Sequence, residues 1–496
     1  MRLIYIAFAL LSGVASSAPG AERPNIILLM GDDHGWDETG YNGHPHLKTP
    51  VLDEMAASGL RMDRFYSAHP SCSPTRGSVM TGRHPVRYGT FAPNCSIRPE
   101  EITIAHLLKK SGYTCGHFGK WHLGPVKAAS PTSPGAMGFD QWLSHDNFFE
   151  LNPTLSRNGG PPQVFKGESS EIVIAETIEF LKQAQQKKRP FFAVVWFGSP
   201  HEPYSGLDKD LALYDDLPEE YADKQFKLTS NKTGRPTKRP LRDVLRERYA
   251  EITAMDRSIG QLRDWLKNEE LRDDTLVWYC GDNGTPGDGI VTSPFRGQKG
   301  NMYEGGVRVP GIIEWPSGIA KPLVSDVNSV TSDILPTLCK LTGTPLPARP
   351  LDGIDLTPMI DGQMSERPDS IGFWTFDWKA ETKNEPYIKA GFQRGTTPLV
   401  KMMGDIYTRN FVNFHHPKIT DQDFAGSRVL LGNRYKLVVH SKRGGESTSE
   451  LFDLRDDPAE TKNLVERQPQ VAAAMQSELR DWQLSVLKSL TAADYE

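Results

Sequence analysis

Four long apolar segments constrain the fold of this 496-residue chain more than any other feature of its sequence. They occupy residues 25–36, 111–124, 190–204 and 275–284, and each of them runs into charged or polar side chains. Continuous runs that are rich in β-branched and aromatic residues are typical of strands buried on both faces, as in a parallel sheet. We therefore predict four buried strands that belong to one sheet.

Helical patterns lie between these segments. Residues 169–185 follow a capping Ser-Ser-Glu sequence, and residues 246–268 carry apolar side chains at helical spacing. Strands that alternate with helices predict an α/β domain with a large, mostly parallel central sheet and helices on both faces. Ligands of such sheets bind beyond the carboxyl ends of the strands, so we expect the four polar clusters to converge on one site.

The pattern changes towards the C-terminus. Residues 427–440 are typical of two short strands around a Gly-Asn turn, a further strand follows at 449–458, and an amphipathic helix is expected at about 468–487. These elements predict a smaller C-terminal α+β domain with an antiparallel sheet and a terminal helix. Its boundary with the large domain is expected between residues 371 and 426.

We predict three parts along the chain. Residues 1–18 combine a basic residue, an apolar run and a small-residue cleavage site, which is the pattern of a secretory signal peptide; a short membrane anchor is the alternative. The large domain is expected at residues 22–375 and the small one at 376–496. No stretch reaches transmembrane length, so we expect an exported protein without a membrane span. It would be periplasmic or extracellular, or lysosomal or secretory in a eukaryotic host.

Charge and cysteine content exclude several classes of protein. The formal net charge of −5 gives no sign of a nucleic-acid partner or a polybasic membrane anchor. Five cysteines leave at least one thiol without a disulfide partner or with another use. No C-x-x-C pair occurs, which argues against a zinc site built from thiolates.

Two acidic pairs at strand ends indicate a metal site. Asp32 and Asp33 follow the first apolar segment, and Asp282 and Asn283 follow the last. Their side chains offer only oxygen ligands, which suit a hard cation such as Ca²⁺ or Mg²⁺. The alternative is that the aspartates form turns or cap a helix.

The segment around Cys72 is typical of an anion site. Ser73 and Pro74 are expected to act as the N-cap and first residue of a helix, which places Cys72 just before a helix N-terminus. Free N–H groups there favour an anion, and Arg76 can add a bidentate contact to an oxyanion. A buried structural cysteine beside a surface arginine remains the alternative.

Several ordered motifs resemble those of the sulfatase family. The sequence CSPTR at residues 72–76, followed by VMTG at 79–82, resembles the family signature. The further motifs in family order are DD at 32–33, GKWHLG at 119–124, SPH at 199–201, DNG at 282–284 and the lysine at 299. The resemblance implies an alkaline-phosphatase-like fold and a sulfuric ester hydrolase of the arylsulfatase type. It also implies that a maturation enzyme converts Cys72 to Cα-formylglycine.

The resemblance further implies the site residues. The implied catalytic residues are Cys72, Arg76, Lys120, His122, His201 and Lys299. The implied metal ligands are Asp32, Asp33, Cys72, Asp282 and Asn283. The oxygen cage is built mostly from protein atoms, which favours Ca²⁺, with Mg²⁺ as the alternative.

The family chemistry gives each catalytic group a role. The hydrated aldehyde at residue 72 is a gem-diol, and one of its hydroxyls would attack sulfur. Arg76, Lys120 and Lys299 would hold the sulfate oxygens. His201 would protonate the leaving oxygen, and His122 would deprotonate the remaining hydroxyl.

Aromatic loops favour a sulfated carbohydrate as the substrate. Residues 142–162, 372–378 and 410–417 mix aromatic with hydrogen-bonding side chains, although packing between domains explains them equally well. The candidate substrate-binding residues are His145, Asp146, Asn147 and Arg296. Two alternatives to a sulfatase stay open: a phosphonate monoester or phosphodiester hydrolase of the same superfamily, and a non-catalytic exported binding protein with Cys72 in a disulfide.

Overall fold

The computed structural model describes residues 23–230, 233–378, 386–398, 408–442 and 444–495. The predicted signal peptide at residues 1–18 lies outside the described residues. Within those ranges, no helix combines the length and the apolar character that crossing a membrane requires.

The four apolar segments form the predicted strands. They are β1 (Asn25–Gly31), β4 (Thr114–Lys120), β8 (Phe191–Trp196) and β11 (Thr275–Gly281). These strands lie side by side in the order β11-β1-β8-β4, and every pair among them is parallel. The prediction of a parallel centre is confirmed, and the carboxyl ends of all four strands lie at one edge of the sheet.

Shorter strands extend this centre to a sheet of ten strands, in the order β14-β2-β13-β11-β1-β8-β4-β5-β6-β7. The pairs β11–β13, β13–β2, β5–β6 and β6–β7 are antiparallel, whereas the remaining pairs, including β14–β2 at one edge, are parallel. The added strands are β2 (Leu60–Met62), β5 (Gln141–His145), β6 (Thr154–Arg157), β7 (Gln163–Val164), β13 (Gly311–Glu314) and β14 (Leu323–Ser325).

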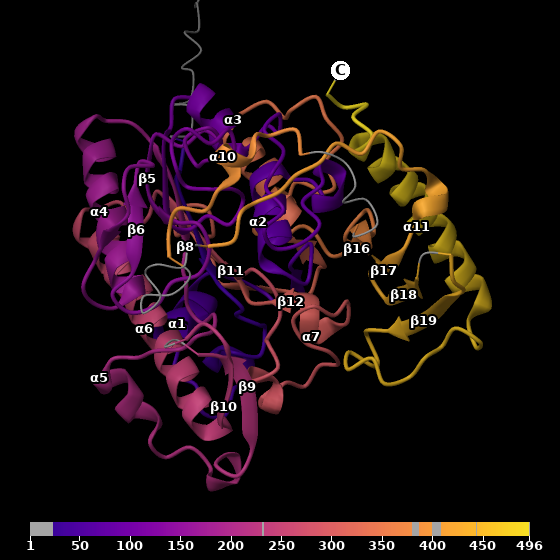
Figure 1. Ribbon diagram of the computed structural model, residues 1–496, viewed down its shortest axis with the longest axis horizontal. Coiled ribbons are helices and arrows are strands. Elements are labelled where there is room, and N and C mark those ends of the chain that lie inside the picture. Colours follow the sequence, from indigo (N-terminus) through magenta and orange to yellow (C-terminus); the bar gives the residue numbers. More distant parts are fainter. Residues whose placement is uncertain (1–22, 231–232, 379–385, 399–407, 443, 496) are drawn as a thin grey trace, which may run out of the picture.

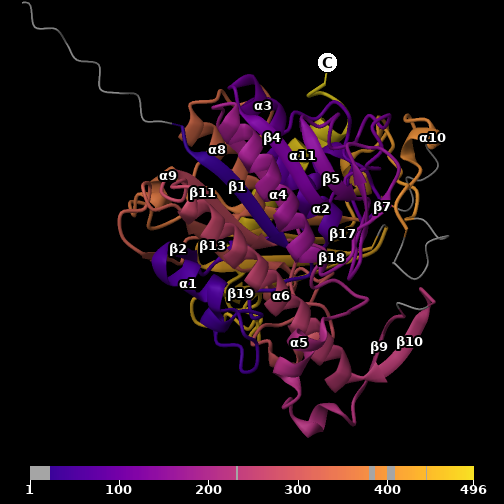
Figure 2. The same cartoon turned by 90° about the vertical axis from the view of Figure 1, so that its left-hand side faces the viewer.

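Helices cover both faces of the sheet, as predicted (Figures 1 and 2). Alternate residues of β1 point to opposite faces, so Ile26 and Leu28 belong to one apolar core and Ile27 and Leu29 to the other. The first core is closed by α2 (Cys72–Thr81), α3 (Ile104–Lys110) and α8 (Ile334–Thr342). The second core is closed by α1 (Pro50–Ser58), α4 (Ser169–Gln186) and α6 (Leu241–Asn268).

The C-terminal part forms the predicted antiparallel sheet, which lies at the side of the molecule in yellow and orange in Figure 1. Its strands are β16 (Ile371–Phe376), β17 (Gly426–Leu431), β18 (Tyr435–Ser441) and β19 (Ser447–Asp453). The terminal helix α11 (Pro469–Leu490) packs on this sheet through Met475 and Leu479. Since β16 pairs with β17 along its whole length, a boundary at residues 375/376 runs through a strand of the small sheet.

Two smaller sheets and several short helices complete the chain. A hairpin of β9 (Gln225–Thr229) and β10 (Pro236–Pro240) stands out from the body of the molecule in Figure 2. A three-stranded sheet joins β12 (Arg308–Val309), β3 (Phe65–Tyr66) and β15 (Ser329–Val330). The short helices are α5 (Asp208–Leu211), α7 (Glu304–Val307), α9 (Thr357–Ile360) and α10 (Ala390–Gln393).

Candidate functional site

The two acidic pairs meet because β1 and β11 are parallel neighbours in register. Asp32 and Asp33 follow β1, Asp282 and Asn283 follow β11, and all four side chains are buried. The backbone N–H of Asp33 donates to Oδ1 of Asp282 at 2.9 Å, and Nδ2 of Asn283 donates to Oδ1 of Asp33 at 3.0 Å. The sheet therefore brings together four of the five residues predicted as metal ligands.

Each of the three carboxylates is paired with a predicted sulfate-binding cation. The pairs, each at 2.6 Å, are Lys120 Nζ with Asp32 Oδ2, Lys299 Nζ with Asp33 Oδ1, and Arg76 Nη2 with Asp282 Oδ2. The cations come from the end of β4, from the loop before α7 and from the first turns of α2. The three cations thus come from three separate segments of the chain and meet at the cluster of metal-ligand carboxylates.

The charges of this cluster shift its carboxyl groups in opposite directions. Burial, together with the neighbouring Asp32 carboxylate, raises the pKa of Asp282 to about 6. Burial also acts to raise the pKa of Asp33, but Lys299 and His201 outweigh it and hold that pKa below its usual range. A divalent cation would relieve the repulsion between these buried carboxylates.

The donor atoms fit a hard cation. Oδ1 of Asp32 and Oδ1 of Asn283 are buried and accept no hydrogen bond from the described residues. Ligand atoms of Asp32, Asp33, Cys72 and His201 all lie within 4.8 Å of one another. Buried oxygens with free lone pairs, next to further carboxylates, match the oxygen-rich coordination of Ca²⁺ or Mg²⁺.

Cys72 is the first residue of α2, and its Sγ lies 3.9 Å from Oδ1 of Asp33. The predicted N-cap is wrong, because Ser71 rather than Ser73 precedes the helix and Pro74 is its third residue. Proline is tolerated there because N–H groups of the first turn have no acceptor inside the helix. Burial raises the pKa of the Cys72 thiol to about 12, so an unmodified side chain would be a weak nucleophile at neutral pH.

All five cysteines lie among the described residues, and all five are free and buried. Cys72 therefore has no disulfide partner in the structure. This finding contradicts the alternative in which Cys72 serves as half of a disulfide in a non-catalytic binding protein.

The two predicted catalytic histidines lie in different environments. His201 Nε2 is 3.7 Å from Oδ2 of Asp33 and 3.5 Å from Nζ of Lys299. Burial lowers the pKa of His201 to about 4, although Asp33 acts to raise it. His122 is buried and lacks a hydrogen-bond partner on either ring nitrogen among the described residues, and burial together with Lys120 lowers its pKa well below the usual range. Burial therefore favours the neutral form of both imidazoles.

Aromatic rings that the sequence did not single out pack on these histidines. Phe148 stacks on His201 with ring centroids 4.5 Å apart, and Phe411 meets His122 edge-on at 6.2 Å. Phe148 follows β5, whereas Phe411 comes from the segment that leads into the small domain. Both lie in stretches that are aromatic-rich in sequence, but their partners could not be inferred without the tertiary structure.

Three candidate substrate-binding residues lie at the carboxyl end of β5, of which His145 is the last residue. Oδ1 of Asp146 accepts from the backbone N–H of Val126 at 2.8 Å, and Oδ2 accepts from the backbone N–H and the hydroxyl of Thr397. The Asp146 carboxylate is thus occupied in joining two loops. His145 is buried, and its Nδ1 accepts from the backbone N–H of Asn147 at 3.0 Å. A substrate role for His145, Asp146 and Asn147 stays a prediction.

Arg296 is not brought to the metal site. Its guanidinium pairs with Glu450 at 3.1 Å and stacks on the ring of Tyr303 at 3.8 Å. Because Glu450 belongs to β19, Arg296 joins the loop of Lys299 to the small domain. This contact favours a role for Arg296 in positioning that loop.

One buried residue of the site was missed by the sequence analysis. Arg248 of α6 donates to the carbonyl oxygens of Asp33 at 2.7 Å and Pro200 at 2.8 Å, and it pairs with Glu38 at 2.6 Å. Asp33 adopts a left-handed backbone conformation with φ of 61°, which non-glycine residues rarely do. Arg248 therefore fixes two strand-end loops at once. A charged residue within the apolar stripe of residues 244–252 was the sequence signal that could have revealed it.

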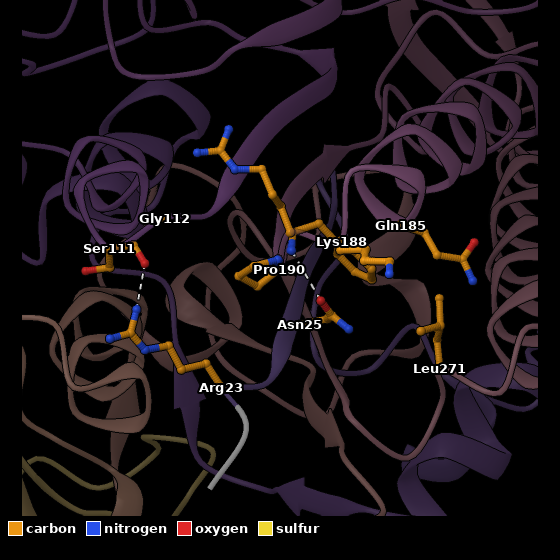
Figure 3. A pocket seen from close by; sticks show the side chains of 10 residues that line it. Arg23, Asn25, Ser111, Gly112, Gln185, Lys188, Pro190 and Leu271 are labelled. Atoms are coloured by element: carbon orange, nitrogen blue, oxygen red, sulfur yellow. Dashed lines mark hydrogen bonds between the residues drawn. The ribbon is translucent and has the colours of Figure 1, made fainter. Parts of the chain in front are cut away.

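A separate cavity of about 500 Å³ lies at the opposite edge of the sheet (Figure 3). Asn25 and Phe191, which begin β1 and β8, line it together with Arg23 and Ser111. Nη1 of Arg23 donates to the carbonyl oxygen of Ser111 at 2.6 Å, as the dashed line in Figure 3 marks. This cavity is at the amino ends of the strands and shares no residue with the metal site.

The fold and the site agree with a comparison against known families, in which a model described as "Sulfatase" matches residues 24–344. The chain belongs to the sulfatase family. N-acetylgalactosamine-6-sulfatase of Mus musculus is 32% identical, in an alignment that covers 94% of this chain and 92% of the relative. Arylsulfatase A of Bos taurus is 29% identical, with 98% of this chain and 90% of the relative covered.

Solved structures share the fold of this sulfatase. The structure of Ps i-CgsB in complex with k-i-k-neocarrahexaose superimposes with a TM-score of 0.72 and 22% identity, and covers 94% of this chain and 93% of the other. The predicted family, fold class and enzyme class are therefore confirmed, and this sulfatase is a sulfuric ester hydrolase.

Proposed function

We propose that this sulfatase hydrolyses sulfate esters of a carbohydrate, with a formylglycine made from Cys72 and a divalent metal, preferably Ca²⁺. The observation that carries the proposal is the convergence of Cys72, the four metal-ligand candidates and three cations at one edge of the sheet. Three positively charged side chains around a metal site are complementary to a negatively charged group of a substrate.

The residues that would hold the metal are Asp32, Asp33, Asp282 and Asn283, with the modified residue 72 as a further ligand. The ion would act as a Lewis acid that lowers the pKa of an oxygen it binds, and the formylglycine would supply the nucleophilic hydroxyl. Calcium is favoured because it accepts a flexible cage of protein oxygens, whereas Mg²⁺ retains several waters.

The cations of the site would bind and orient the sulfate. Arg76, Lys120 and Lys299 lie within 2.6 Å of the three carboxylates, so their charged groups surround the same small volume as the ligand oxygens. Arg76 is fixed further by stacking on the ring of Trp196 at 5.1 Å. Fixed donors of this kind stabilise charge that develops on sulfate oxygens in the transition state.

The two histidines would move protons on opposite sides of the sulfur. His201 Nε2 would protonate the leaving oxygen, and a bound sulfate ester favours the required charged imidazole because a nearby anion raises its pKa. His122, which is buried and neutral, would accept a proton from the hydroxyl at residue 72. Its unpartnered ring nitrogens are available for this task within the described part of the chain.

The carbohydrate part of the proposal rests on two observations. Phe148 and Phe411 lie beside the catalytic histidines, where aromatic faces can pack on a sugar ring. The relative in mouse is named for a sulfated amino sugar, N-acetylgalactosamine 6-sulfate. Export by the signal peptide, and maturation of Cys72 by a formylglycine-generating enzyme, belong to the same proposal.

The peptide that contains residue 72 provides the decisive measurement. Protein from a host with the maturation enzyme should give the mass of formylglycine in this peptide, and Cys72→Ala should retain the fold and lose turnover. An unmodified thiol in active protein, or an active Cys72→Ala variant, would refute the assigned nucleophile.

A panel of esters tests the substrate class. We expect sulfate release from sulfated mono- or oligosaccharides, with slower turnover of matched phosphonate and phosphate esters. Activity confined to aryl sulfates would contradict the carbohydrate assignment. Faster turnover of a phosphonate monoester or phosphodiester would favour the alternative hydrolase of the same superfamily.

A further inference from the structure

The β9–β10 hairpin is anchored directly beside the catalytic His201. Glu202, the next residue in the chain, accepts hydrogen bonds from the backbone N–H of Thr229 at 2.9 Å and from its hydroxyl at 3.1 Å. In Figure 2 the hairpin projects from the molecule on the side towards which β1 runs, which is the side of the metal site. The hairpin is thus in place to contact parts of a substrate that extend beyond the scissile ester.

The two faces of the hairpin differ in character. Phe226 and Leu228 of β9 face the body of the protein, where Leu228 packs against Tyr204 and Val244. Side chains alternate along a strand, so Lys227 lies on the same face as Thr229. The exposed face of the hairpin therefore carries Lys227, about 7 Å along the strand from the residue that binds Glu202.

A second lysine stands directly opposite the first. Lys238 of β10 is the cross-strand partner of Lys227 in the antiparallel pair, and both are exposed. Side chains that pair across an antiparallel ladder share one face, and like charges in this position destabilise the pair.

No acidic side chain of the described residues neutralises these two lysines. The stretch from 224 to 240 contains no aspartate or glutamate, and no ion pair of either lysine occurs within the described ranges. Two other cations of the stretch are already engaged, since Arg239 pairs with Glu247 at 2.7 Å and Lys224 lies over the ring of Tyr221. Lys227 and Lys238 are therefore free to bind an external anion.

The space between the hairpin and the His201 loop is hollow. A cavity of about 380 Å³ is lined by Pro203 and Tyr204 on one side and by residues of the hairpin, including Thr229 and Thr237, on the other. Its walls carry the hydroxyl of Thr229, which donates to Glu202, and the hydroxyl of Thr237, a group of the kind that binds sugar hydroxyls. The cavity adjoins Pro203, which is two residues after His201 in the chain.

We propose that the exposed face of this hairpin, through Lys227 and Lys238, binds a second anionic group of an extended polyanionic glycan. The substrate would then be an oligosaccharide with sulfate or carboxylate groups on neighbouring sugars, held at one group by the hairpin and cleaved at another. This inference rests on the proposed hydrolysis of carbohydrate sulfates.

The test compares a large and a small anionic substrate. The double variant Lys227→Gln/Lys238→Gln should bind a chondroitin 6-sulfate hexasaccharide about tenfold more weakly at low salt, as two cationic contacts of modest strength predict. Binding is measured by calorimetry in full-length Cys72→Ala protein, which prevents turnover. Hydrolysis of 4-nitrophenyl sulfate, measured with residue 72 intact, should be unchanged by the two substitutions.

Two control variants separate a local site from a general charge effect. Lys267→Gln/Lys340→Gln removes the same charge from exposed positions on α6 and α8 and should leave hexasaccharide affinity unchanged. Lys227→Arg/Lys238→Arg should retain affinity. The difference between parent and Lys→Gln variant should shrink in about 1 M salt, where the screening length is only about 3 Å.

Each outcome decides the proposal. Equal affinities of the parent and the Lys227→Gln/Lys238→Gln variant, or no binding of the hexasaccharide by the parent at low salt, would overturn it. Loss of affinity in both Lys→Gln pairs would assign the effect to net charge and would also overturn it. Lack of sulfate release from sulfated saccharides by mature protein would instead count against the proposed function, whatever the binding result.

Discussion

Lys436 of the small domain provides the sharpest test of how the two domains depend on each other. This residue of β18 is fully buried, and its ammonium pairs with Glu304 at 3.0 Å and with Glu460 at 2.9 Å. Glu304 begins α7, immediately after the loop that carries Lys299, and also accepts from the hydroxyl of Tyr66 at 3.0 Å. We predict that Lys436→Met destabilises the protein and disturbs the position of Lys299.

The expected magnitude follows from the distances. With an effective dielectric constant of about 20, a pair of unit charges at 2.9–3.0 Å gains roughly 5.5 kcal/mol, so the two pairs gain about 11 kcal/mol. Desolvation of a buried ammonium and its partners opposes this gain by several kcal/mol per ion. Removal of one partner of a buried ionic group typically costs about 3–5 kcal/mol, which is the loss we expect in the free energy of unfolding.

The loss should depend on pH in a defined direction. Burial raises the pKa of Glu460 to about 7 against the lowering effect of Lys436. A carboxyl group with a raised pKa contributes its stability below its ordinary value of about 4.5 and loses it as pH rises through the folded-state value. Without Lys436 the pKa of Glu460 rises further. The loss in the free energy of unfolding caused by Lys436→Met should therefore grow from about pH 6 to about pH 9.

Urea unfolding monitored by tryptophan fluorescence measures the effect. The exposed Lys442→Met is the matched control and should change stability by less than about 0.5 kcal/mol. The double variant Lys436→Met/Glu460→Gln should regain part of the loss, because it removes one of the carboxylates left without a partner. A single-variant loss below about 1 kcal/mol, or additive losses in the double variant, would refute the reasoning.

Three further outcomes are expected. Chelation by EDTA should abolish activity, and Ca²⁺ should restore it more fully than Mg²⁺; equal recovery with both ions, measured as turnover, would contradict the preference for calcium. Asp282→Asn should weaken metal binding in calorimetry and lower the thermal midpoint, because Arg76 keeps a buried charge without its closest partner. Arg248→Lys should reduce metal affinity about 10–100-fold, since a single ammonium cannot reach both Asp33 and Pro200, and an unchanged affinity would refute this positioning role.

Much of the fold could be predicted because the signals that specify it are local. The runs that became β1, β8 and β11 are almost entirely apolar, which is typical of strands buried on both faces, and β4 is buried along its whole length as well. The hairpin of β17 and β18 was predicted from the Gly-Asn turn between its two strands. The strands at the edges of the large sheet, such as β7 with only two residues, carry too little pattern to be recognised.

The start of α2 shows the limit of local rules. A serine followed by proline predicted a helix that begins after Cys72, yet the helix begins at Cys72 itself. The first turn accepts proline at several positions because its N–H groups need no partner inside the helix. The residue types therefore placed the first residue of the helix at Pro74, two positions after the observed start at Cys72.

The sequence by itself determined which chemical groups this sulfatase brings to its site, because in a parallel sheet the residues that follow the strands must meet at one edge. The rule places the two acidic pairs, Lys120 and both histidines, which end or follow β1, β4, β8 and β11. It does not place Cys72 and Arg76 of α2 or Lys299, which the family motifs indicated. Only the tertiary structure decided how these groups are held. Arg248 ties Asp33 to the loop of His201, Lys436 ties the small domain to the loop of Lys299, and the hairpin is anchored at Glu202. Each of these contacts joins residues far apart in sequence, and no local pattern encodes which distant side chain will neutralise a buried charge.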